Sequence, residues 1–135
     1  MNYGEKALAF RDSGCNCAQS VLCALAERVG LDIETAKRLS AGLGGGLRAG
    51  EACGAYAGAV LAMGMALARG EKAGEPDAPL AGYVSELGKG FREAFEVIRC
   101  TDLMEKNGGD KSVCRQYTAW CAEHAARLIE KYEEK

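Results

Sequence analysis

The sequence predicts an all-α fold, a single-domain helical bundle of about six helices arranged around a central helix of small residues. Apolar residues recur at helical spacing along almost the whole chain, and runs of β-branched residues are few. The chain contains two prolines, Pro76 and Pro79, and both fall in one short segment. We therefore expect one domain over residues 1–135, with a linker near residues 70–79.

The first half of the chain predicts four helices with recognisable ends. In chain order they are Tyr3–Asp12, Cys17–Val29, a helix from the cap Asp32 to about Leu43, and Glu51–Arg69. Asn16 and Gln19 have the spacing of a capping box, which predicts the start of the second helix. Gly30 follows the last apolar residue of that helix and ends it. A glycine cluster beginning at Gly42 ends the third helix.

The predicted helix Glu51–Arg69 carries small residues at four-residue spacing. They are Gly54, Gly58, Ala62 and Ala66. Such a stripe lets another backbone come very close, which favours a central position for this helix. The same stripe also suits a homodimer interface.

Residues 52–68 carry no charge and approach the length of a short membrane span. They are mostly alanine and glycine, however, and Arg48, Glu51 and Arg69 flank them closely. This composition favours a buried core helix, so we expect no membrane insertion.

The second half predicts one long helix, one short helix and a long carboxy-terminal helix. They are Leu80–Arg99, Asp102–Lys106 with Thr101 as its cap, and Val113–Lys135 with Ser112 as its cap. The glycines after Asn107 indicate a turn between the last two helices.

The charges and the amino terminus restrict the class of protein. The 17 basic and 19 acidic residues are scattered together, and no basic face indicates nucleic-acid binding. The first residues show no basic stretch followed by an apolar segment, so we expect a cytoplasmic protein. In a reducing compartment, seven cysteines are better suited to hold a metal or to exchange electrons than to form structural disulfides.

Four cysteines fall near predicted helix starts or junctions. Cys17, Cys53 and Cys114 lie in the first turn of a predicted helix, where free N–H groups and the helix dipole favour a thiolate. Cys100 lies at a helix junction, just before the expected cap Thr101. Four thiolates from four separate segments could surround one cationic or clustered-metal centre.

The other cysteines and the single histidine have simpler interpretations. Cys23 flanks the apolar face of its helix and is expected to pack in the core. Cys15 forms a C-x-C pair with Cys17 but could be a spare exposed thiol, and Cys121 could be core or lie just outside the site. His124 could ligate, although a surface or interface histidine is more common.

The glycines from Gly42 to Gly50 lead into a helix start, a general arrangement for binding an anion. The nucleotide-binding motifs G-x-x-x-x-G-K-[ST] and strand-G-x-G-x-x-G are missing from the sequence. A tight turn that brings Cys53 beside other cysteines explains the same glycines better.

Several motifs occur together in one order along the chain. They are Asn16-Cys17-Ala18-Gln19, Gly42-x-Gly44-Gly45-Gly46, Cys53-Gly54-Ala55-x-x-Gly58, Cys100 and Cys114. This order resembles the C_GCAxxG_C_C family of redox-active proteins, and its four characteristic cysteines correspond to Cys17, Cys53, Cys100 and Cys114. The resemblance implies a small prokaryotic protein associated with redox chemistry and with an iron-sulfur centre. A similar domain occurs in split-Soret cytochromes, but this chain has no C-x-x-C-H haem motif.

The resemblance and the helix pattern together lead to one functional hypothesis. An iron-sulfur cluster, 2Fe-2S more than 4Fe-4S, would be held by the four cysteines and would pass electrons to a redox partner protein. We expect an electron carrier or a redox accessory protein more than a stand-alone enzyme. Two alternatives stay open: a thiol-disulfide protein that uses two of the same cysteines, and a structural zinc site with all four.

Overall fold

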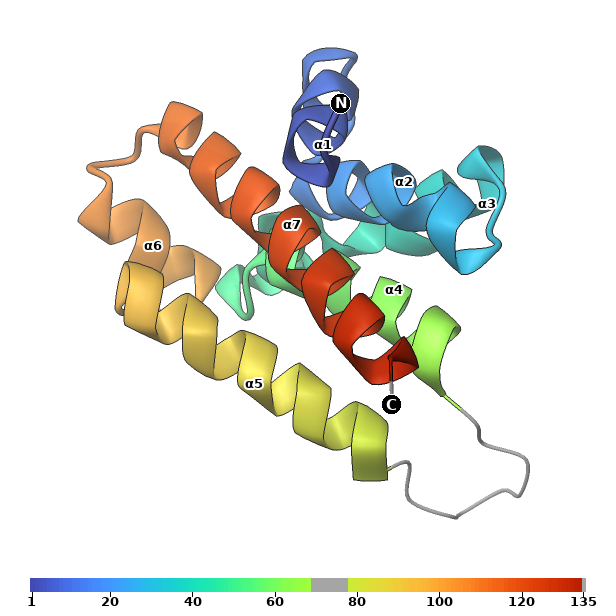
Figure 1. Ribbon diagram of the computed structural model, residues 1–135. Helices are drawn as coiled ribbons and strands as arrows, with labels where there is room; N and C mark the ends of the chain where they lie inside the picture. Colours follow the sequence, from blue (N-terminus) through green and yellow to red (C-terminus); the bar gives the residue numbers. More distant parts are fainter. Residues whose placement is uncertain (69–77, 135) are drawn as a thin grey trace.

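The computed structural model describes residues 1–68 and 78–134 and confirms the all-α fold (Figure 1). The described residues form seven α-helices and no strand beyond one isolated bridge. The helices are α1 (Tyr3–Asp12), α2 (Cys17–Val29), α3 (Ile33–Ser40), α4 (Gly54–Leu67), α5 (Ala78–Phe95), α6 (Cys100–Lys106) and α7 (Cys114–Glu133). Most of the expected linker near residues 70–79 lies outside the described residues.

The bounds of α1 and α2 agree with the sequence prediction, because both starts are fixed by local side-chain caps. Asn16 accepts a hydrogen bond from the backbone of Gln19, and Gln19 accepts one from the backbone of Asn16. At the other end of α2, Gly30 adopts the left-handed conformation with φ of 78°.

The bounds of the later helices differ from the prediction. The helix expected from Glu51 begins only at Gly54, since residues 51–53 are extended and pair with the chain before α6. The helix expected to reach Arg99 ends at Phe95, where Glu96 has a φ of 74° and turns the chain. Ser112 does not cap the last helix; Asp110 caps a short 3-10 turn before α7.

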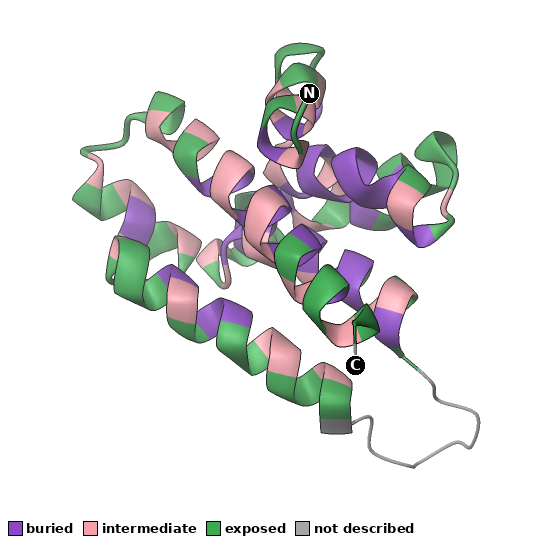
Figure 2. Ribbon diagram, viewed as in Figure 1, coloured by how far each residue is buried: buried purple, intermediate pink, exposed green. Residues whose placement is uncertain are grey.

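The core lies where α2, α4 and α7 meet. Helix α4 packs against α2, α7 and α5, and α7 also packs against α1 and α2. In Figure 1 α7 crosses the middle of the bundle, and Figure 2 shows the buried residues concentrated on α2 and on the inward faces of the other helices. Phe91 from α5 is fully buried against Tyr117 and Trp120 of α7.

The stripe of small residues on α4 lets α2 approach closely. A Cβ atom on Gly58 would lie 2.5 Å from the backbone oxygen of Ala18, closer than any relaxed contact. This confirms the expected close backbone approach and shows that this part of the stripe packs within the chain. Homodimer formation stays a prediction.

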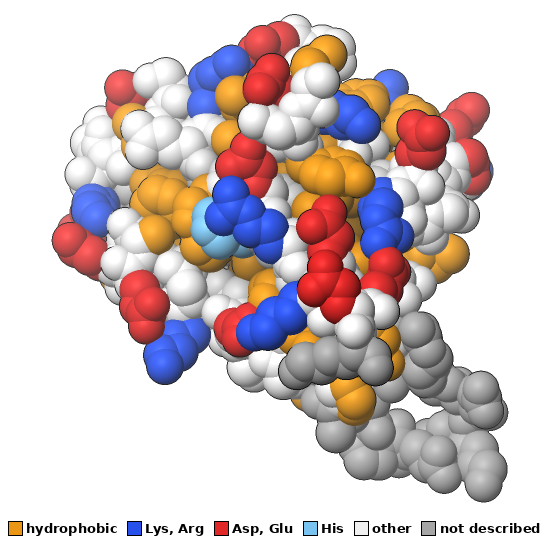
Figure 3. Space-filling model, viewed as in Figure 1, with side chains coloured by type: hydrophobic (Ala, Val, Ile, Leu, Met, Phe, Trp, Pro, Cys, Tyr) orange, Lys and Arg blue, Asp and Glu red, His pale blue; other side chains and the backbone are white. Residues whose placement is uncertain are grey.

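The charged side chains lie mostly on the outside of the bundle. Figure 3 shows acidic and basic groups interspersed over one face of the molecule, without a region of a single sign. Several form exposed ion pairs, such as Lys131 with Glu86 and Lys106 with Glu96. Such pairs contribute little to stability, so the bundle depends on its apolar core.

The α2–α4 contact yields a paired prediction. Gly58→Ala should lower the free energy of unfolding by about 1–3 kcal/mol, because the new methyl group meets the fixed backbone of Ala18. Gly64 lies on the same helix with no atom within 4 Å of its Cβ position, so Gly64→Ala should raise stability by about 0.5–1 kcal/mol. Chemical denaturation of the two variants measures both effects, and equal effects would contradict the assigned contact.

Candidate functional site

All four cysteines of the expected site lie at a helix start. Cys17, Cys100 and Cys114 are the first residues of α2, α6 and α7, and Cys53 is the residue immediately before α4. The prediction was correct for Cys17. For Cys53 and Cys100 it was wrong in detail, because Cys53 precedes its helix and Cys100 begins one that Thr101 had been expected to cap.

A short antiparallel bridge joins the segments that carry Cys53 and Cys100. Ala52 pairs with Arg99 in this bridge. The backbone N–H of Cys53 donates to the carbonyl of Ile98 at 2.8 Å, and the N–H of Cys100 donates to the carbonyl of Glu51 at 2.6 Å. These bonds hold the start of α4 beside the start of α6.

The start of α2 lies against the same place. A Cβ atom on Gly54 would be 2.5 Å from the sulfur of Cys17, so the Cys17 side chain lies directly over the backbone that follows Cys53. Glycine is the residue that leaves room for that sulfur. The Cys-Gly pair at residues 53 and 54 therefore brings two of the four thiols together.

The glycine loop before Cys53 packs against the start of α6. Four successive residues, Gly45 to Arg48, have left-handed backbone conformations. A Cβ atom on Gly46 would lie 2.6 Å from the Cβ of Cys100, and the Thr101 hydroxyl donates to the carbonyl of Gly50 at 2.9 Å. The loop thus makes the tight turn that the sequence predicted beside the cysteines.

Cys114 contacts α6 from the start of α7. Its thiol lies 3.8 Å from the thioether sulfur of Met104, and its carbonyl accepts a hydrogen bond from the Thr118 hydroxyl at 3.1 Å. Methionine sulfur is a soft group that suits a site of soft ligands. The sequence analysis did not identify Met104, because nothing in its spacing distinguishes it from a core methionine.

Burial, followed by repulsion from neighbouring cysteines, raises the pKa values of Cys53, Cys100 and Cys114. The pKa of Cys53 is raised to about 12, first by burial and then by the neighbouring Cys17, against hydrogen bonds from the N–H groups of Tyr56 and Ala55 that lower it. Burial and then Cys17 also raise the pKa values of Cys100 and Cys114. The expected preference of helix starts for thiolates is therefore outweighed in the metal-free protein.

Two side-chain donors, one on α1 and one at the end of α6, are buried without a hydrogen-bond partner. Among the described residues, the buried side-chain nitrogen and oxygen atoms that lack a hydrogen-bond partner are Nε of Arg11 and Nδ2 of Asn107. The Arg11 charge lowers the pKa of Cys114, against the burial that raises it. Asn107 accepts a hydrogen bond from the Tyr117 hydroxyl, whose pKa is raised by burial and also by Cys114 and Cys53. Sequence reasoning missed both donors, because only the folded chain brings them to the cysteines.

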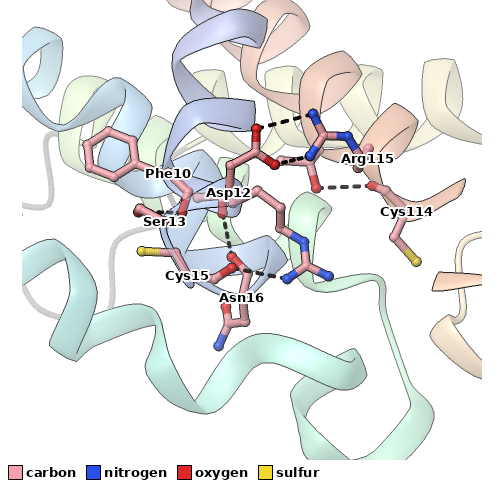
Figure 4. A network of polar contacts seen from close by, with 10 residues as sticks. Phe10, Asp12, Ser13, Cys15, Asn16, Cys114 and Arg115 are labelled. Atoms are coloured by element: carbon pink, nitrogen blue, oxygen red, sulfur yellow. Dashed lines mark hydrogen bonds and ion pairs between the residues drawn. The ribbon is translucent and has the colours of Figure 1, made fainter. Parts of the chain in front are cut away.

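Cys15 and Cys23 form a separate pair beside the site. Both are buried, which excludes the alternative that Cys15 is an exposed thiol. Burial raises the pKa of Cys23 to about 11, and a hydrogen bond with Cys15 raises it as well. Figure 4 shows the sulfur of Cys15 pointing away from that of Cys114. The expected packing role of Cys23 agrees with its 3% exposure.

Cys121 and His124 lie on the same helix but have different surroundings. Burial raises the pKa of Cys121 well above its usual value, and Cys53 and Cys17 raise it further, so this thiol is buried on the side of the four cysteines. His124 stacks on Trp120 with ring centres 3.9 Å apart, and its Nδ1 lies 2.9 Å from the Trp120 carbonyl oxygen. Both contacts lie within α7 and neither involves a cysteine.

The chain thus brings Cys17, Cys53, Cys100 and Cys114 to one end of the bundle as reduced, free thiols. In the described part of the chain, no three Cys, His, Asp or Glu side chains are arranged around a single point as ligands of one metal ion. Such a group of thiols can bind soft metals or exchange electrons.

The family comparison gives the class of protein. The family model described as "Putative redox-active protein (C_GCAxxG_C_C)" matches residues 15–134. The chain belongs to the C_GCAxxG_C_C family. As a member of this redox-active family, the protein carries its motifs at the helix starts described above. No curated protein and no solved structure gives a significant match to the chain. None of the described helices has the length and apolar character needed to cross a membrane.

The raised pKa of Cys53 predicts a pH dependence of stability. In the unfolded chain this thiol ionises near 9, whereas in the folded protein it ionises near 12. Its contribution to stability should be fully present below about pH 9 and should be lost as the pH rises from 9 toward 12. The stability of metal-free, reduced Cys53→Ser protein should therefore fall less steeply than that of the wild type over this range. Denaturation at several pH values measures this, and parallel curves would contradict the burial assigned to Cys53.

Proposed function

We propose that this protein holds an iron-sulfur cluster on Cys17, Cys53, Cys100 and Cys114 and passes single electrons to a partner protein. The observation that carries the proposal is the meeting of four cysteines from four separate helix starts at one end of the bundle. Four cysteine thiolates are the common ligand set of both 2Fe-2S and 4Fe-4S clusters, and we favour 2Fe-2S.

The residues around the cysteines fit such a group. The glycines at 46 and 54 let the side chains of Cys100 and Cys17 lie directly against the neighbouring backbone, where a Cβ atom would clash with them. The buried donors on Arg11 and Asn107 have no protein acceptor, and the sulfur atoms of a cluster accept hydrogen bonds. A cluster contains several atoms, so its ligands need not converge on one point.

Mutual repulsion among the thiols also supports a cationic partner. Cys17 raises the pKa values of Cys53, Cys100 and Cys114, so four thiolates could not lie together without added positive charge. Iron ions would supply that charge, and the N–H groups at the helix starts would stabilise the remaining negative charge. Metal loading of such a site releases protons and therefore becomes more favourable as the pH rises.

The burial of the four cysteines suits electron exchange with a partner. Cys53 is buried, whereas Cys17, Cys100 and Cys114 are partly exposed. When bound, an iron-sulfur cluster supplies one-electron redox chemistry. The partly exposed cysteines place one side of the site near the surface, within reach of a docked redox partner, while Cys53 anchors the other side in the core.

Anaerobic purification tests this proposal. Protein made without oxygen should contain iron and show visible absorption bands, and the iron content per chain separates 2Fe-2S from 4Fe-4S. Cys53→Ser and Cys114→Ser should each lose most of the iron and absorption, because each removes one of four ligands. Cys23→Ser is the matched control, since Cys23 is also buried but pairs with Cys15, and it should retain both signals.

Other results would replace the proposal with a specific alternative. A reversible mass change of two hydrogens in metal-free protein would indicate thiol-disulfide exchange between two cysteines. Stoichiometric zinc without iron would indicate a structural metal site. Loss of iron in Cys23→Ser to the same extent as in Cys53→Ser would contradict the assignment of the four ligands.

A further inference from the structure

Arg11 is a partly buried cation whose surroundings leave one donor, the buried Nε–H, unused. It lies in the last turn of α1, and one terminal nitrogen of its guanidinium donates to the carbonyl of Cys15 at 3.1 Å. Its Nε atom is buried and has no hydrogen-bond partner. A buried donor of a charged group that stays unsatisfied costs free energy, so its presence calls for an explanation.

Three arginines of the bundle have a carboxylate partner. Arg28 pairs with Glu133, Arg99 with Glu51, and Arg115 with Asp12. Among the described residues Arg11 has no carboxylate partner, although Asp12 is its neighbour in sequence. The fold therefore leaves a positive charge uncompensated at this position.

The packing of α1 places this charge beside the cysteines. Helix α1 packs against α2 and α7, which begin at Cys17 and Cys114. Asp12 forms its ion pair with Arg115, so the residues next to Arg11 and next to Cys114 are tied together (Figure 4). The Arg11 guanidinium also donates a hydrogen bond to the carbonyl of Cys15, in the loop that leads into Cys17.

The charges that face Cys114 support this placement. Arg11 and Lys111 lower the pKa of Cys114, while burial, Cys17 and Cys100 raise it. Lys111 is an exposed residue, so salt screens its effect, whereas the Nε of Arg11 is buried. Arg11 is therefore the cation with the more persistent influence on this side of the site.

We propose that Arg11 is a positioning residue of the four-cysteine centre, whose unused Nε–H donates to the sulfur atoms on the Cys114 side when the centre is loaded. This inference rests on the proposed function. A hydrogen bond and a positive charge next to the sulfurs stabilise the more negative, reduced state more than the oxidised state, so Arg11 raises the reduction potential. In the metal-free protein the same donor remains unsatisfied.

Two measurements on Arg11→Gln test the inference. The reduction potential of the loaded variant should be lower than that of the wild type. The rise in melting temperature on loading should also be smaller, because the wild type gains a partner for Nε on loading and the variant does not. If Arg11 had only a structural role, Arg11→Gln would lower the melting temperatures of the metal-free and the loaded protein equally. The rise in melting temperature on loading would then be the same as in the wild type.

Two further variants serve as controls. Arg28→Gln removes an arginine that is already paired with Glu133 at the opposite end of α2 from Cys17, and it should change neither the potential nor the loading-induced rise. Arg11→Lys keeps the positive charge without Nε, and its potential should fall between those of the wild type and Arg11→Gln. It also provides a test if the glutamine variant does not fold.

Failure of this inference and failure of the proposed function give different results. Wild-type protein without iron would overturn both. Loaded wild type and loaded Arg11→Gln with equal potentials would overturn the role of Arg11 alone. A lysine variant with a potential no higher than that of the glutamine variant, or an equal shift in Arg28→Gln, would also contradict it.

Discussion

The structure depends on the contact in which α2 packs directly against two glycines of α4. Gly58 lies against the backbone of Ala18, and Gly54 lies against the sulfur of Cys17. A Cβ atom on Gly58 would push the helices apart, because the backbone of Ala18 cannot move aside as a flexible side chain can, and a Cβ atom on Gly54 would displace the Cys17 sulfur. This contact fixes the start of α2 beside the start of α4, and the meeting of Cys17 and Cys53 follows from it.

The backbone around the cysteines is more strained than the bundle that supports it. Leu47 and Arg48 adopt left-handed conformations without being glycines, at a cost of about 1–2 kcal/mol each. Hydrogen bonds hold this turn in place: the Arg48 side chain donates to the carbonyl of Ala41, and the N–H of Glu51 to that of Gly46. Strain that surrounding contacts maintain is common at functional sites, and here it lies between two of the four cysteines.

The sequence could predict those helix ends that are set by residues next to them in the chain. The capping box of Asn16 and the left-handed Gly30 set the ends of α2, and both are visible as residue patterns. The extended segment before Cys53 was not predictable in this way, because its hydrogen bonds go to Ile98, far along the chain. Arg11 was missed for the same reason, since only the packing of α1 on α7 brings it to Cys114. The four cysteines could be named as candidates because their order matches a family motif and because the start of α2 at Cys17 is a local feature.

The bundle can be stable without a metal centre, and the raised pKa of Cys53 is one reason. Burial raises the pKa of Cys53 to about 12, so this thiol adds no negative charge to the site near neutral pH. The core of α2, α4 and α7 is apolar and extends well beyond the cysteines, and residues such as Phe91 and Ile129 are fully buried within it. The bundle therefore has a source of stability that does not need metal, unlike a small zinc-dependent domain. Loading would then replace protons by a cationic group in a frame that is already folded, and buried donors such as Nε of Arg11 would gain their missing acceptors.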